Sequence, residues 1–393
     1  MRLDIACSNI VDCEHKTAPV DEEGEFFAVG TPAMRNHRIN YDEARRISRE
    51  TFESWTRRLT PRPGDLLLAR EAPVGPIVRL PDAANVAPGQ RTVLLRPDPG
   101  VADSAFLYYA LTAPAAQARL IVKAEGSTVH HLNVPDIRSF EVWIPSLAEQ
   151  QAIAEVLGAL DDKIAANTAL AATLAQLTSK EFAATVHYAT WAPRFDEVAE
   201  ISGGGTPSTK NSALWDGDIW WATPTDMTAL AGPYLESTSR RITAAGLAAC
   251  SSKLFAPGAI LMSSRATIGA LAVNNVPTAI NQGFIAVEPY DPRLRWWLFH
   301  EMESRVQEFI SWANGATFLE LSRGTFKRLP VRIPEESLLV AFESRIAPLH
   351  DVARQALAEN RTLAAIRDAL LPQLMSGKLR VHDAEQAVAA AGV

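Results

Sequence analysis

The sequence predicts an α+β chain that contains two similar α/β domains and two long helices packed as an antiparallel coiled coil. Three observations lead to this prediction. Segments of the first half recur in the second half in the same order. Each half ends in a long stretch whose apolar residues step by three and four, and a β-rich region with Pro-Gly turns precedes each of these stretches. The chain therefore reads as a pseudo-twofold internal repeat.

The repeat is clearest in two pairs of segments. PGDLLLAREAPVG at 63–75 matches PGAILMSSRATIG at 257–269, at an offset of 194 residues. GSTVHHLNVPDIRSFEVWIP at 126–145 matches GATFLELSRGTFKRLPVRIP at 315–334, at an offset of 189. Each unit therefore begins with a β-rich segment, which is followed by one helix (105–123 in the first unit and 295–313 in the second). A loop that begins with glycine comes next, and then a short strand that ends in Ile-Pro. A long helix closes the unit.

The two closing helices carry narrow apolar stripes, which suit a single partner helix. Because each copy supplies one such helix, we expect them to pack on each other, and pseudo-twofold symmetry makes the pair antiparallel. Asn167 and Asn360 interrupt the stripes, and each residue either fixes the register of the pair or points outward. The residues predicted for the stripe are Ile153, Leu157, Leu160, Ile164, Ala171 and Leu174 in the first helix and Phe342, Ile346, Leu349, Ala353, Ala356, Leu363 and Leu370 in the second.

These patterns define five segments of the chain. We expect a first domain at 1–145, a central helical spacer at 146–187, a second domain at 188–334, a C-terminal helical spacer at 335–381 and a frayed tail at 382–393. A helix of about 38 residues spans roughly 57 Å, which is more than a small globular domain needs. Two modules on a rod suit a polymer with a regular repeat, such as duplex DNA, and they also suit two protein partners.

Composition places the chain among ordinary globular proteins, with 47% hydrophobic and 21% charged residues. It has no apolar run of about 18 residues that would predict a membrane span, and MRLDIACSNIVDCEHK lacks an apolar signal core. Three cysteines without CxxC spacing argue against a zinc site and fit a reducing compartment. We therefore expect a cytoplasmic protein without a membrane partner.

The charge distribution is uneven. The net charge is −7, but residues 35–96 contain 12 Lys and Arg against 7 Asp and Glu, a local net of +5. Residues 146–187 contain 2 against 5, a net of −3. The basic stretch is either a solvated surface or the phosphate-binding face of a nucleic-acid-binding domain, because binding depends on local rather than global charge.

Motifs of common catalytic sites are absent from the sequence. GGGTPSTK at 203–210 is rich in glycine but does not match the phosphate-binding loop GxxxxGK[ST]. GxSxG, HExxH, the kinase motifs and the Asn/Asp-Pro-Pro-aromatic motif of amino-methyltransferases are also missing. The cluster DCEHK at 12–16 is too closely spaced for a metal site. We expect His130 and His131 to have a structural or DNA-facing role rather than to act as a general base. The chain reads as non-catalytic.

IPSLAEQQ at 144–151 and LLPQLMSGKLRV at 370–381 resemble motifs of one family, the specificity subunits of type I restriction–modification systems. The first is similar to the start of the family's central conserved region, and the second to the end of its second conserved region. VAEISGGGTPSTKNSALWDGDIWWATPTDM at 198–227 resembles the opening of a target recognition domain. SSRATIGALAV and INQGF continue that pattern, while DCEHKTAP and PGDLLLAREAPVG resemble another type of recognition domain. The second copy departs from the pattern after Ile333-Pro334, where EESLLVAF replaces SLAEQQAI.

The resemblance implies a concrete function. Such a subunit binds a split DNA target with one recognition domain per half-site, and its paired helices set the gap. Two modification subunits would dock on it and carry the S-adenosylmethionine chemistry, and two restriction subunits would add ATP- and Mg-dependent translocation and cleavage. No cofactor is expected on this chain. The residues expected to form the spacer or to bind partner subunits are Leu147, Gln150, Gln151, Ile153, Leu157, Leu160, Ile164, Ile346, Leu349, Leu363 and Leu370.

Polar residues at strand ends and in loops are the candidates for DNA contact, since Arg, Asn and Gln read base edges and hydroxyl or N–H groups bind phosphates. The 203–210 loop is either a phosphate cradle or a plain surface turn, Trp220 and Trp221 are expected in the core, and residues 35–62 are the candidate phosphate face. The candidates are His15, Lys16, Thr17, Arg70 and Gln90 in the first unit and Thr206, Ser208, Thr209, Lys210, Thr223, Thr225, Asp226, Ser263, Ser264, Arg265, Asn281 and Gln282 in the second.

Two other function classes stay open at this point. One is a rod-linked, non-enzymatic adaptor that joins two protein partners, which would show no base-selective binding. The other is an enzyme, such as a stand-alone methyltransferase or nuclease, against which the missing motifs count.

Overall fold

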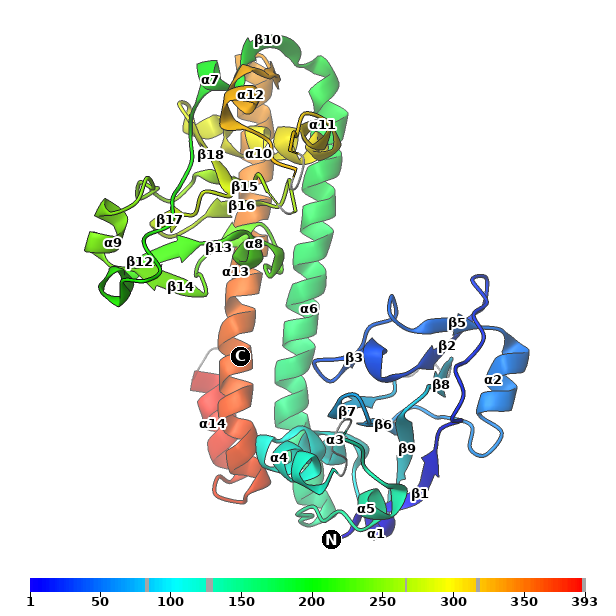
Figure 1. The fold of residues 1–393 in the computed structure, drawn as a ribbon. Coiled ribbons are helices and arrows are strands. Elements are labelled where there is room, and N and C mark those ends of the chain that lie inside the picture. Colours follow the sequence, from blue (N-terminus) through cyan, green and yellow to red (C-terminus); the bar gives the residue numbers. More distant parts are fainter. Residues whose placement is uncertain (82–84, 125–129, 266, 316–318, 391–393) are drawn as a thin grey trace. The chain divides into compact units, whose positions relative to one another are not determined.

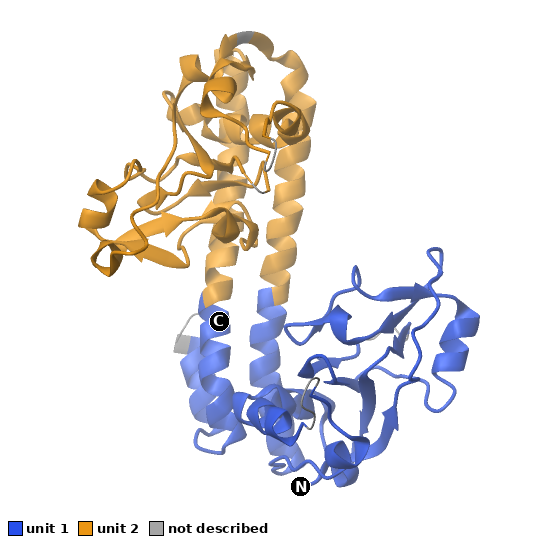
Figure 2. Ribbon diagram, in the orientation of Figure 1, with its two compact units in different colours: residues 1–164, 362–393 blue, residues 165–361 orange. Residues whose placement is uncertain are grey.

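The computed structural model describes residues 1–81, 85–124, 130–265, 267–315 and 319–390. The chain forms two compact units, each of which contains part of both long helices (Figure 2). The first unit comprises residues 1–164 and 362–393, and the second comprises residues 165–361. The first long helix, which was predicted at 146–187, thus begins in the first unit and ends in the second.

The first unit contains a four-stranded antiparallel sheet, a three-stranded sheet and a two-stranded hairpin (Figure 1). A short turn of helix, α1 (Leu3–Ala6), precedes the first strand, and η1 (Thr31–Ala33) and the helix α2 (Arg49–Trp55) connect later strands. The sheets have the orders β1-β9-β6-β7 (Cys7–Asp12, Thr92–Pro97, Leu66–Arg70, Val74–Arg79) and β5-β2-β8 (Arg45–Ile47, Phe26–Val29, Val86–Pro88), and the hairpin is β3-β4 (Met34–Arg35, Arg38–Ile39).

The second unit repeats this plan. A two-stranded pair, β10 (Thr190–Arg194) with β19 (Pro330–Ile333), joins its sheets to the long helices. Its short helical segments are η2 (Val186–Tyr188), α7 (Phe195–Val198), η3 (Ser212–Leu214), α8 (Pro224–Thr228), α9 (Ala244–Ala248) and η4 (Pro292–Leu294). Its sheets are β11-β18-β15-β16-β13 (Ala199–Ser202, Phe284–Pro289, Ile260–Ser263, Leu271–Asn274, Tyr234–Leu235) and β14-β12-β17 (Arg240–Ile242, Trp215–Ala222, Thr278–Ile280).

The strand orders match between the units, which confirms the predicted internal repeat. β1-β9-β6-β7 corresponds to β11-β18-β15-β16, and β5-β2-β8 corresponds to β14-β12-β17. In both three-stranded sheets the central strand pairs antiparallel with one neighbour and parallel with the other. The second unit adds β13 and α8 and has no described counterpart of the hairpin β3-β4. The two units therefore share a framework and differ in their connecting segments.

The single helix predicted after each sheet is wrong in both units, because each is broken into two. In the first unit α3 (Ser104–Thr112) and α4 (Pro114–Lys123) meet at Pro114, which lacks an N–H and keeps the preceding residue out of the helical conformation. In the second unit α10 (Arg295–Ser304) and α11 (Val306–Ser311) meet at Arg305. The Gly-opened loops follow, and Gly126 lies outside the described residues. Next come α5 (Val134–Arg138) and α12 (Arg323–Arg328).

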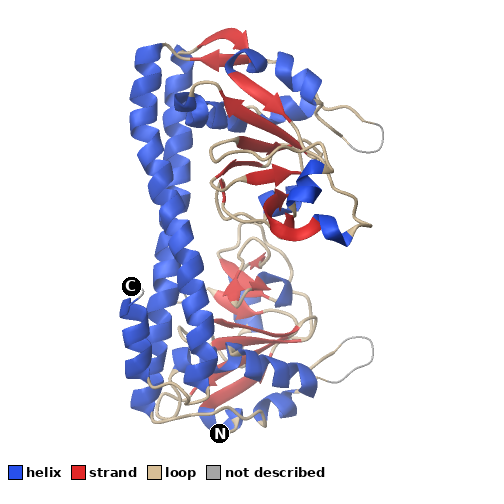
Figure 3. Ribbon diagram, turned by 90° about the vertical axis from the view of Figure 1, so that its left-hand side faces the viewer, coloured by secondary structure: helices blue, strands red, loops and turns tan. Residues whose placement is uncertain are grey.

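The two long helices are α6 (Leu147–Thr185, 39 residues) and α13 (Glu336–Met375, 40 residues). In the first unit Leu157 of α6 packs in one apolar cluster with Leu370 of α13. In the second unit Phe182 near the end of α6 packs with Phe342 near the start of α13. Within each unit the helices therefore run in opposite directions, which confirms the predicted antiparallel pairing. Figure 3 shows that in each unit the helices lie on one side of the strands.

Asn167 occupies the seam between the helices, as one of the two interpretations of the stripe predicted. It is 5% exposed, and its Nδ2 donates to the carbonyl oxygen of Ala356 at 3.3 Å and to Oε2 of Glu359 at 2.7 Å. Asn360 is half-buried and donates to Oγ1 of Thr168 at 3.0 Å. Both amides thus form hydrogen bonds between the helices, which is how a polar seam residue fixes register.

The expectation of a frayed tail at 382–393 is wrong for residues 382–390, because these residues belong to a packed helix. The helix α14 (Val381–Ala390) places Ala384, fully buried, against the cluster formed by α3, α6 and α13. Val381 and Val388 pack beside it. Their spacing of three and four residues puts all three on one helix face, so the apolar residues of DAEQAV hold the helix in place.

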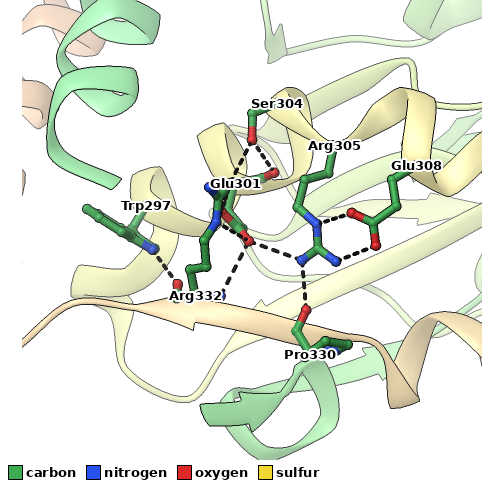
Figure 4. Close-up of polar contacts among 7 residues, drawn as sticks. All are labelled: Trp297, Glu301, Ser304, Arg305, Glu308, Pro330 and Arg332. Carbon is green, nitrogen blue, oxygen red and sulfur yellow. Dashed lines mark hydrogen bonds and ion pairs between the residues drawn. The ribbon is translucent and has the colours of Figure 1, made fainter. Parts of the chain in front are cut away.

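A buried ion cluster fastens the strand β19 to α10 in the second unit (Figure 4). Glu301 is completely buried and lies 3.0 Å from Arg305 and 2.7 Å from Arg332. Arg305 also donates to the carbonyl oxygen of Pro330 at 2.7 Å, and Trp297 Nε1 donates to that of Arg332 at 2.7 Å. The break at Arg305 allows its guanidinium to reach β19. Removing one member would leave a buried charge without its partner, which is strongly destabilising.

A second polar chain of contacts links β13 of this unit to both long helices. The Tyr234 hydroxyl lies 2.9 Å from Nδ1 of His350 in α13, and the Nε2 atoms of His350 and His300 are 3.0 Å apart. His300 Nδ1 lies 2.9 Å from Glu303, which accepts a hydrogen bond of 2.9 Å from Ser179 in α6. Burial, assisted by His300, lowers the pKa of His350 to about 3 from the ordinary 6.5.

We predict that acid destabilises the second unit through His350. Unfolded chains protonate this histidine below pH 6.5, whereas the folded unit resists protonation until about pH 3. The free energy of unfolding therefore falls as the pH drops through this window, by about 2 kcal/mol at pH ~5. Chemical denaturation of the wild type and of His350→Gln across this range measures the difference.

Exposed His187 provides the matched control, since His187→Gln removes a histidine that lies in solvent. The prediction is wrong if the wild type and His350→Gln lose stability in parallel on acidification.

Candidate nucleic-acid interface

Four of the predicted residues form two hydrogen-bonded pairs, at equivalent places in the two units. Thr17 Oγ1 donates to Oε1 of Gln90 at 3.3 Å in the first unit, and Thr206 Oγ1 donates to Oε1 of Gln282 at 2.5 Å in the second. Each glutamine lies two residues after a parallel-paired strand, β8 or β17. The two strands β8 and β17 hold the same position in their three-stranded sheets, so the two glutamines are at equivalent places. We call these the Thr–Gln pairs.

A Thr–Gln pair leaves the amide of glutamine free to contact another group. A glutamine carbonyl has two lone pairs and its NH₂ has two donors, and the threonine uses one acceptor position. The remaining donor and acceptor are the combination that pairs with adenine in the major groove of DNA. The threonine hydrogen bond restricts the rotation of the glutamine side chain, so less conformational entropy is lost on binding.

Arg70 is held inside the first unit. Its Nε lies 3.2 Å from Oδ1 of Asp12, and its Nη1 donates to the carbonyl oxygen of Leu132 at 3.2 Å. His15 bridges the same groups, with Nε2 3.0 Å from Asp12 and Nδ1 3.4 Å from Arg70 Nη2. The Arg70 side chain is only 12% exposed. Contact with a base would require Arg70 to leave these partners.

Ser264 is the counterpart of Arg70 in the second unit. The N–H of Arg70 donates to Arg91, and that of Ser264 donates to Gly283. The carbonyl oxygens of both residues accept from Leu132 and Leu321, respectively. The Ser264 side chain is small and buried, 2% exposed. The same framework position therefore carries a large cation in one unit and a small hydroxyl in the other.

A cavity of about 490 Å³ opens beside Ser264 and Gln282 in the second unit. Arg265 lines it and forms an ion pair with Glu320 at 2.9 Å. Arg323 and Lys327 of α12 also line it, and neither has an ion-pair partner among the residues that the structure describes. The sequence reasoning missed these two cations. Their only signal was the basic run RGTFKR, which lies inside one of the two repeated segments.

The glycine-rich loop at 203–210 is held by two tryptophans. Trp221 Nε1 donates to the carbonyl oxygen of Gly205, and Trp215 Nε1 donates to that of Ser208, both at 3.1 Å. Trp221 is buried as predicted, while Trp220 is half-buried. A side chain at 204 would collide with the backbone of Ile280, so glycine lets the loop approach β17. The exposed residues of this loop are Thr206, Ser208, Thr209 and Lys210.

Several other candidates have their polar groups engaged within the unit. Thr223 donates its N–H and hydroxyl to Asp226 at 2.8 and 2.6 Å. Burial by itself raises the pKa of Asp226, but hydrogen bonds from Thr223 and Ser239 hold it below the ordinary value. Ser263 is fully buried and accepts from Ala270 N–H. Asn281 accepts from the N–H of Gly283 at 2.8 Å. Of the other candidates, Lys16 is exposed, as is Thr225.

The basic stretch at 35–62 divides into paired and unpaired cations. Arg35 lies 3.7 Å from Glu43, Arg49 3.9 Å from Glu25, and Arg57 3.0 Å from Glu14. Arg38 lies 3.8 Å from Asp161 of α6, and Arg58 3.7 Å from Glu14. Arg45, Arg46 and Arg62 have no carboxylate partner among the described residues. The local positive charge is therefore concentrated on fewer residues than the sequence count indicates.

The start of α6 is bound to the first unit rather than left open to a partner. Gln150 is 1% exposed, accepts from the N–H of Asp103 and donates to the carbonyl oxygens of Val101 and Pro145. Gln151 is exposed and, with Leu147, lines a cavity of about 350 Å³ next to Arg62 and Arg96. Of the Glu-Gln-Gln element, Gln151 and Glu149 remain accessible.

Among the described residues, no group of three or more His, Cys, Asp or Glu side chains could hold a metal ion. No helix within the described ranges is long and apolar enough to cross a membrane. Cys13 of the DCEHK cluster is buried, and burial raises the pKa of its thiol.

Comparison with known proteins identifies the family of the chain. The family model described as the type I restriction modification DNA specificity domain matches residues 13–176 and again residues 190–337, together more than half of the chain. The chain belongs to this specificity family. The two matches contain the two Thr–Gln pairs, one in each copy of the domain.

Individual relatives support the same assignment. The chain is 35% identical over 152 residues to the type I restriction enzyme MjaIX specificity subunit of Methanocaldococcus jannaschii, covering 38% of this chain and 35% of that protein. It is 24% identical over 186 residues to the HindI specificity subunit of Haemophilus influenzae, covering 47% and 40%, respectively. The matched segments thus span well under half of each relative.

The similarity to a solved structure covers more of the chain than the sequence matches to these relatives do. The crystal structure of a type I restriction-modification system S subunit from M. genitalium superimposes with a TM-score of 0.62, covering 95% of both chains at 17% identity. This similarity of fold extends to nearly the whole specificity-family chain, including both long helices.

We predict that Arg70→Ala lowers the stability of the first unit by about 2 kcal/mol, because it removes the guanidinium beside Asp12 and leaves the carbonyl oxygen of Leu132 without its side-chain donor. Thermal unfolding monitored by circular dichroism measures the loss. Arg79→Ala is the control, since Arg79 lies on the neighbouring strand β7, is exposed and forms one hydrogen bond, to Ser104.

The alternative, in which Arg70 reads a base, makes the opposite prediction. Arg70→Ala would then retain wild-type stability and lose selectivity at one position of the DNA target.

Proposed function

We propose that this chain is the DNA-binding specificity subunit of a type I restriction–modification complex, and that each α/β domain reads one half of a split DNA target. The observation that carries the proposal is the presence of a Thr–Gln pair at the same strand end in two copies of one fold. Glutamine beside a hydroxyl is suited to base-edge contact. Membership in the specificity family supports the same conclusion.

The helix pair α6–α13 sets the gap between the half-sites in this proposal. A helix of 39 residues is about 58 Å long, enough to carry two domains that bind a duplex at points one or more helical turns apart, each turn being about 34–36 Å. The apolar seam and the amide hydrogen bonds of Asn167 and Asn360 resist sliding of one helix along the other. A fixed register gives a fixed gap.

The chain acts in the cytoplasm with partner subunits in this account. Two modification subunits carry S-adenosylmethionine and methylate the target, and two restriction subunits use ATP and Mg to translocate and cleave DNA. This chain is itself non-catalytic and needs no cofactor. The exposed Gln151, at the start of α6, is a candidate contact for a modification subunit.

An adaptor that joins two proteins is the second candidate function. The repeated fold and the helix pair fit it, but no observation favours it specifically. Base-selective binding separates the two functions, because an adaptor needs no amide side chains presented at equivalent strand ends.

We predict that cells carrying this gene with its neighbouring genes have a split methylated DNA motif with a fixed gap, and that deletion of this gene alone removes it. Genome sequencing with base-modification detection measures this difference. A genome whose methylation is identical with and without the gene contradicts the proposal. Purification of the tagged chain together with a methyltransferase subunit provides a control that the complex assembles.

A further inference from the structure

The two units share a second feature, the sequence Arg-Arg-Ile in an edge strand. It forms β5 (Arg45–Ile47) in the first unit and β14 (Arg240–Ile242) in the second. Arg45 pairs with Ala28 of β2, and Arg240 pairs with Trp221 of β12. Both strands lie at the same edge of their three-stranded sheet. The two first arginines are therefore structural counterparts.

The alternation of side chains along a strand separates the two arginines of each strand. Ile47 and Ile242 are fully buried, so Arg45 and Arg240, two residues earlier, lie on the same face as these isoleucines. Arg46 and Arg241 lie on the opposite face. There the Arg46 guanidinium carbon is 5.6 Å from the centre of the Phe27 ring and that of Arg241 is 3.7 Å from the centre of the Trp220 ring.

In the first unit, the face of Arg45 also carries the Thr–Gln pair. Arg45, Thr17 and Gln90 line one cavity of about 200 Å³. Glu43 lines the same cavity, and its carboxylate lies 3.7 Å from Arg35. The guanidinium of Arg45 is thus next to the proposed base-reading amide and has no carboxylate within ion-pair distance among the described residues.

In the second unit, Arg240 lies over the tryptophans that hold the loop of the Thr–Gln pair. Its guanidinium carbon is 3.6 Å from the centre of the Trp215 ring and 5.8 Å from that of Trp221. These rings donate to the carbonyl oxygens of Ser208 and Gly205, on either side of Thr206. Stacking on a ring fixes the plane of a guanidinium and leaves its N–H edge free for an anion.

Charge favours a phosphate as the group that these arginines bind. Arg45 and Arg240 are exposed and lack carboxylate partners within the described ranges, unlike Arg35, Arg49 and Arg57 close by in the chain. An unneutralised guanidinium binds phosphate bidentately without first giving up an ion pair. Stacking on a tryptophan ring does not explain both arginines. Among the described residues no aromatic ring lies within cation–π distance of Arg45, yet the first unit has an arginine at this position too.

We propose that Arg45 and Arg240 are equivalent contacts to the DNA backbone, one in each recognition domain, which position the neighbouring Gln90 and Gln282 on the bases. The inference rests on the proposed function and adds to it a division of roles within each domain. Phosphate contacts fix the register of a protein on the duplex, and base contacts select the sequence. The arginines therefore set affinity, and the glutamines set specificity.

The test measures binding of the full-length chain, purified with its modification subunit, to a fluorescent duplex of random sequence at several salt concentrations. Arg45→Ala and Arg240→Ala are each expected to weaken binding about tenfold. Each is also expected to reduce the slope of log affinity against log salt by about 0.9, because one phosphate is no longer neutralised. Arg240→Lys and Arg45→Lys retain the charge and are expected to restore most of the slope.

Arg46→Ala and Arg241→Ala are the matched controls, because they remove the same charge from the same strand on the opposite face. They are expected to leave the salt slope at the wild-type value. A structural role alone would lower the melting temperature without changing the slope, so melting curves accompany each variant. The sequence of the methylated motif is expected to stay unchanged in cells that carry Arg45→Ala or Arg240→Ala.

Three results would overturn the inference while leaving the proposed function intact. These are a wild-type salt slope in the Arg45 and Arg240 variants, an equal reduction of the slope in the controls, and a change at one base of the methylated motif. Failure of the wild-type complex to bind duplex DNA would instead overturn the proposed function and the inference together.

Discussion

The apolar seam between α6 and α13 is the interaction on which the rest of the structure depends. Each α/β domain packs its own helices on a segment of this seam. In the first unit α3 contributes Phe106 and Tyr109 to the cluster that contains Leu157 and Leu363. In the second unit α10 contributes Trp297 to the cluster of Phe182 and Phe342. Burial of each such side chain contributes roughly 1.5–3 kcal/mol, so the seam and the domains stabilise one another.

The two units combine a repeated framework with different side chains at equivalent positions. The strand orders and the Thr–Gln pairs are common to both units. The framework position of Arg70 holds Ser264 in the other unit, and the ends of the repeated segments read VWIP and VRIP, so that Trp143 replaces Arg332. Side chains at equivalent positions thus differ, while the order of the strands is kept.

The sequence predicted the fold class, the repeat and the antiparallel helix pair, because apolar periodicity and repeated turn motifs survive sequence divergence. It also identified Thr17, Gln90, Thr206 and Gln282 as candidate DNA contacts. Their pairing could not be foreseen, since each pair joins residues more than 70 positions apart in the chain.

Other features depended on interactions that no short pattern encodes. The partners of Arg70 come from a distant strand and loop, so its inward orientation was invisible in the sequence. The helix break at Arg305, where φ is −113° and ψ is 13°, has no proline or other sequence signal that would predict it. The Arg-Arg-Ile strands are too short to stand out as a repeat, and only the shared sheet position reveals that they correspond.

The central claim is that each domain reads its own half of a split DNA target. The most direct measurement compares the methylated motifs in cells whose only specificity gene encodes either the Gln90→Ala variant or the Gln282→Ala variant. The account predicts that Gln90→Ala relaxes a base in one half-site, that Gln282→Ala relaxes a base in the other, and that the gap is constant. A substitution in one domain that altered both half-sites or the gap would contradict it.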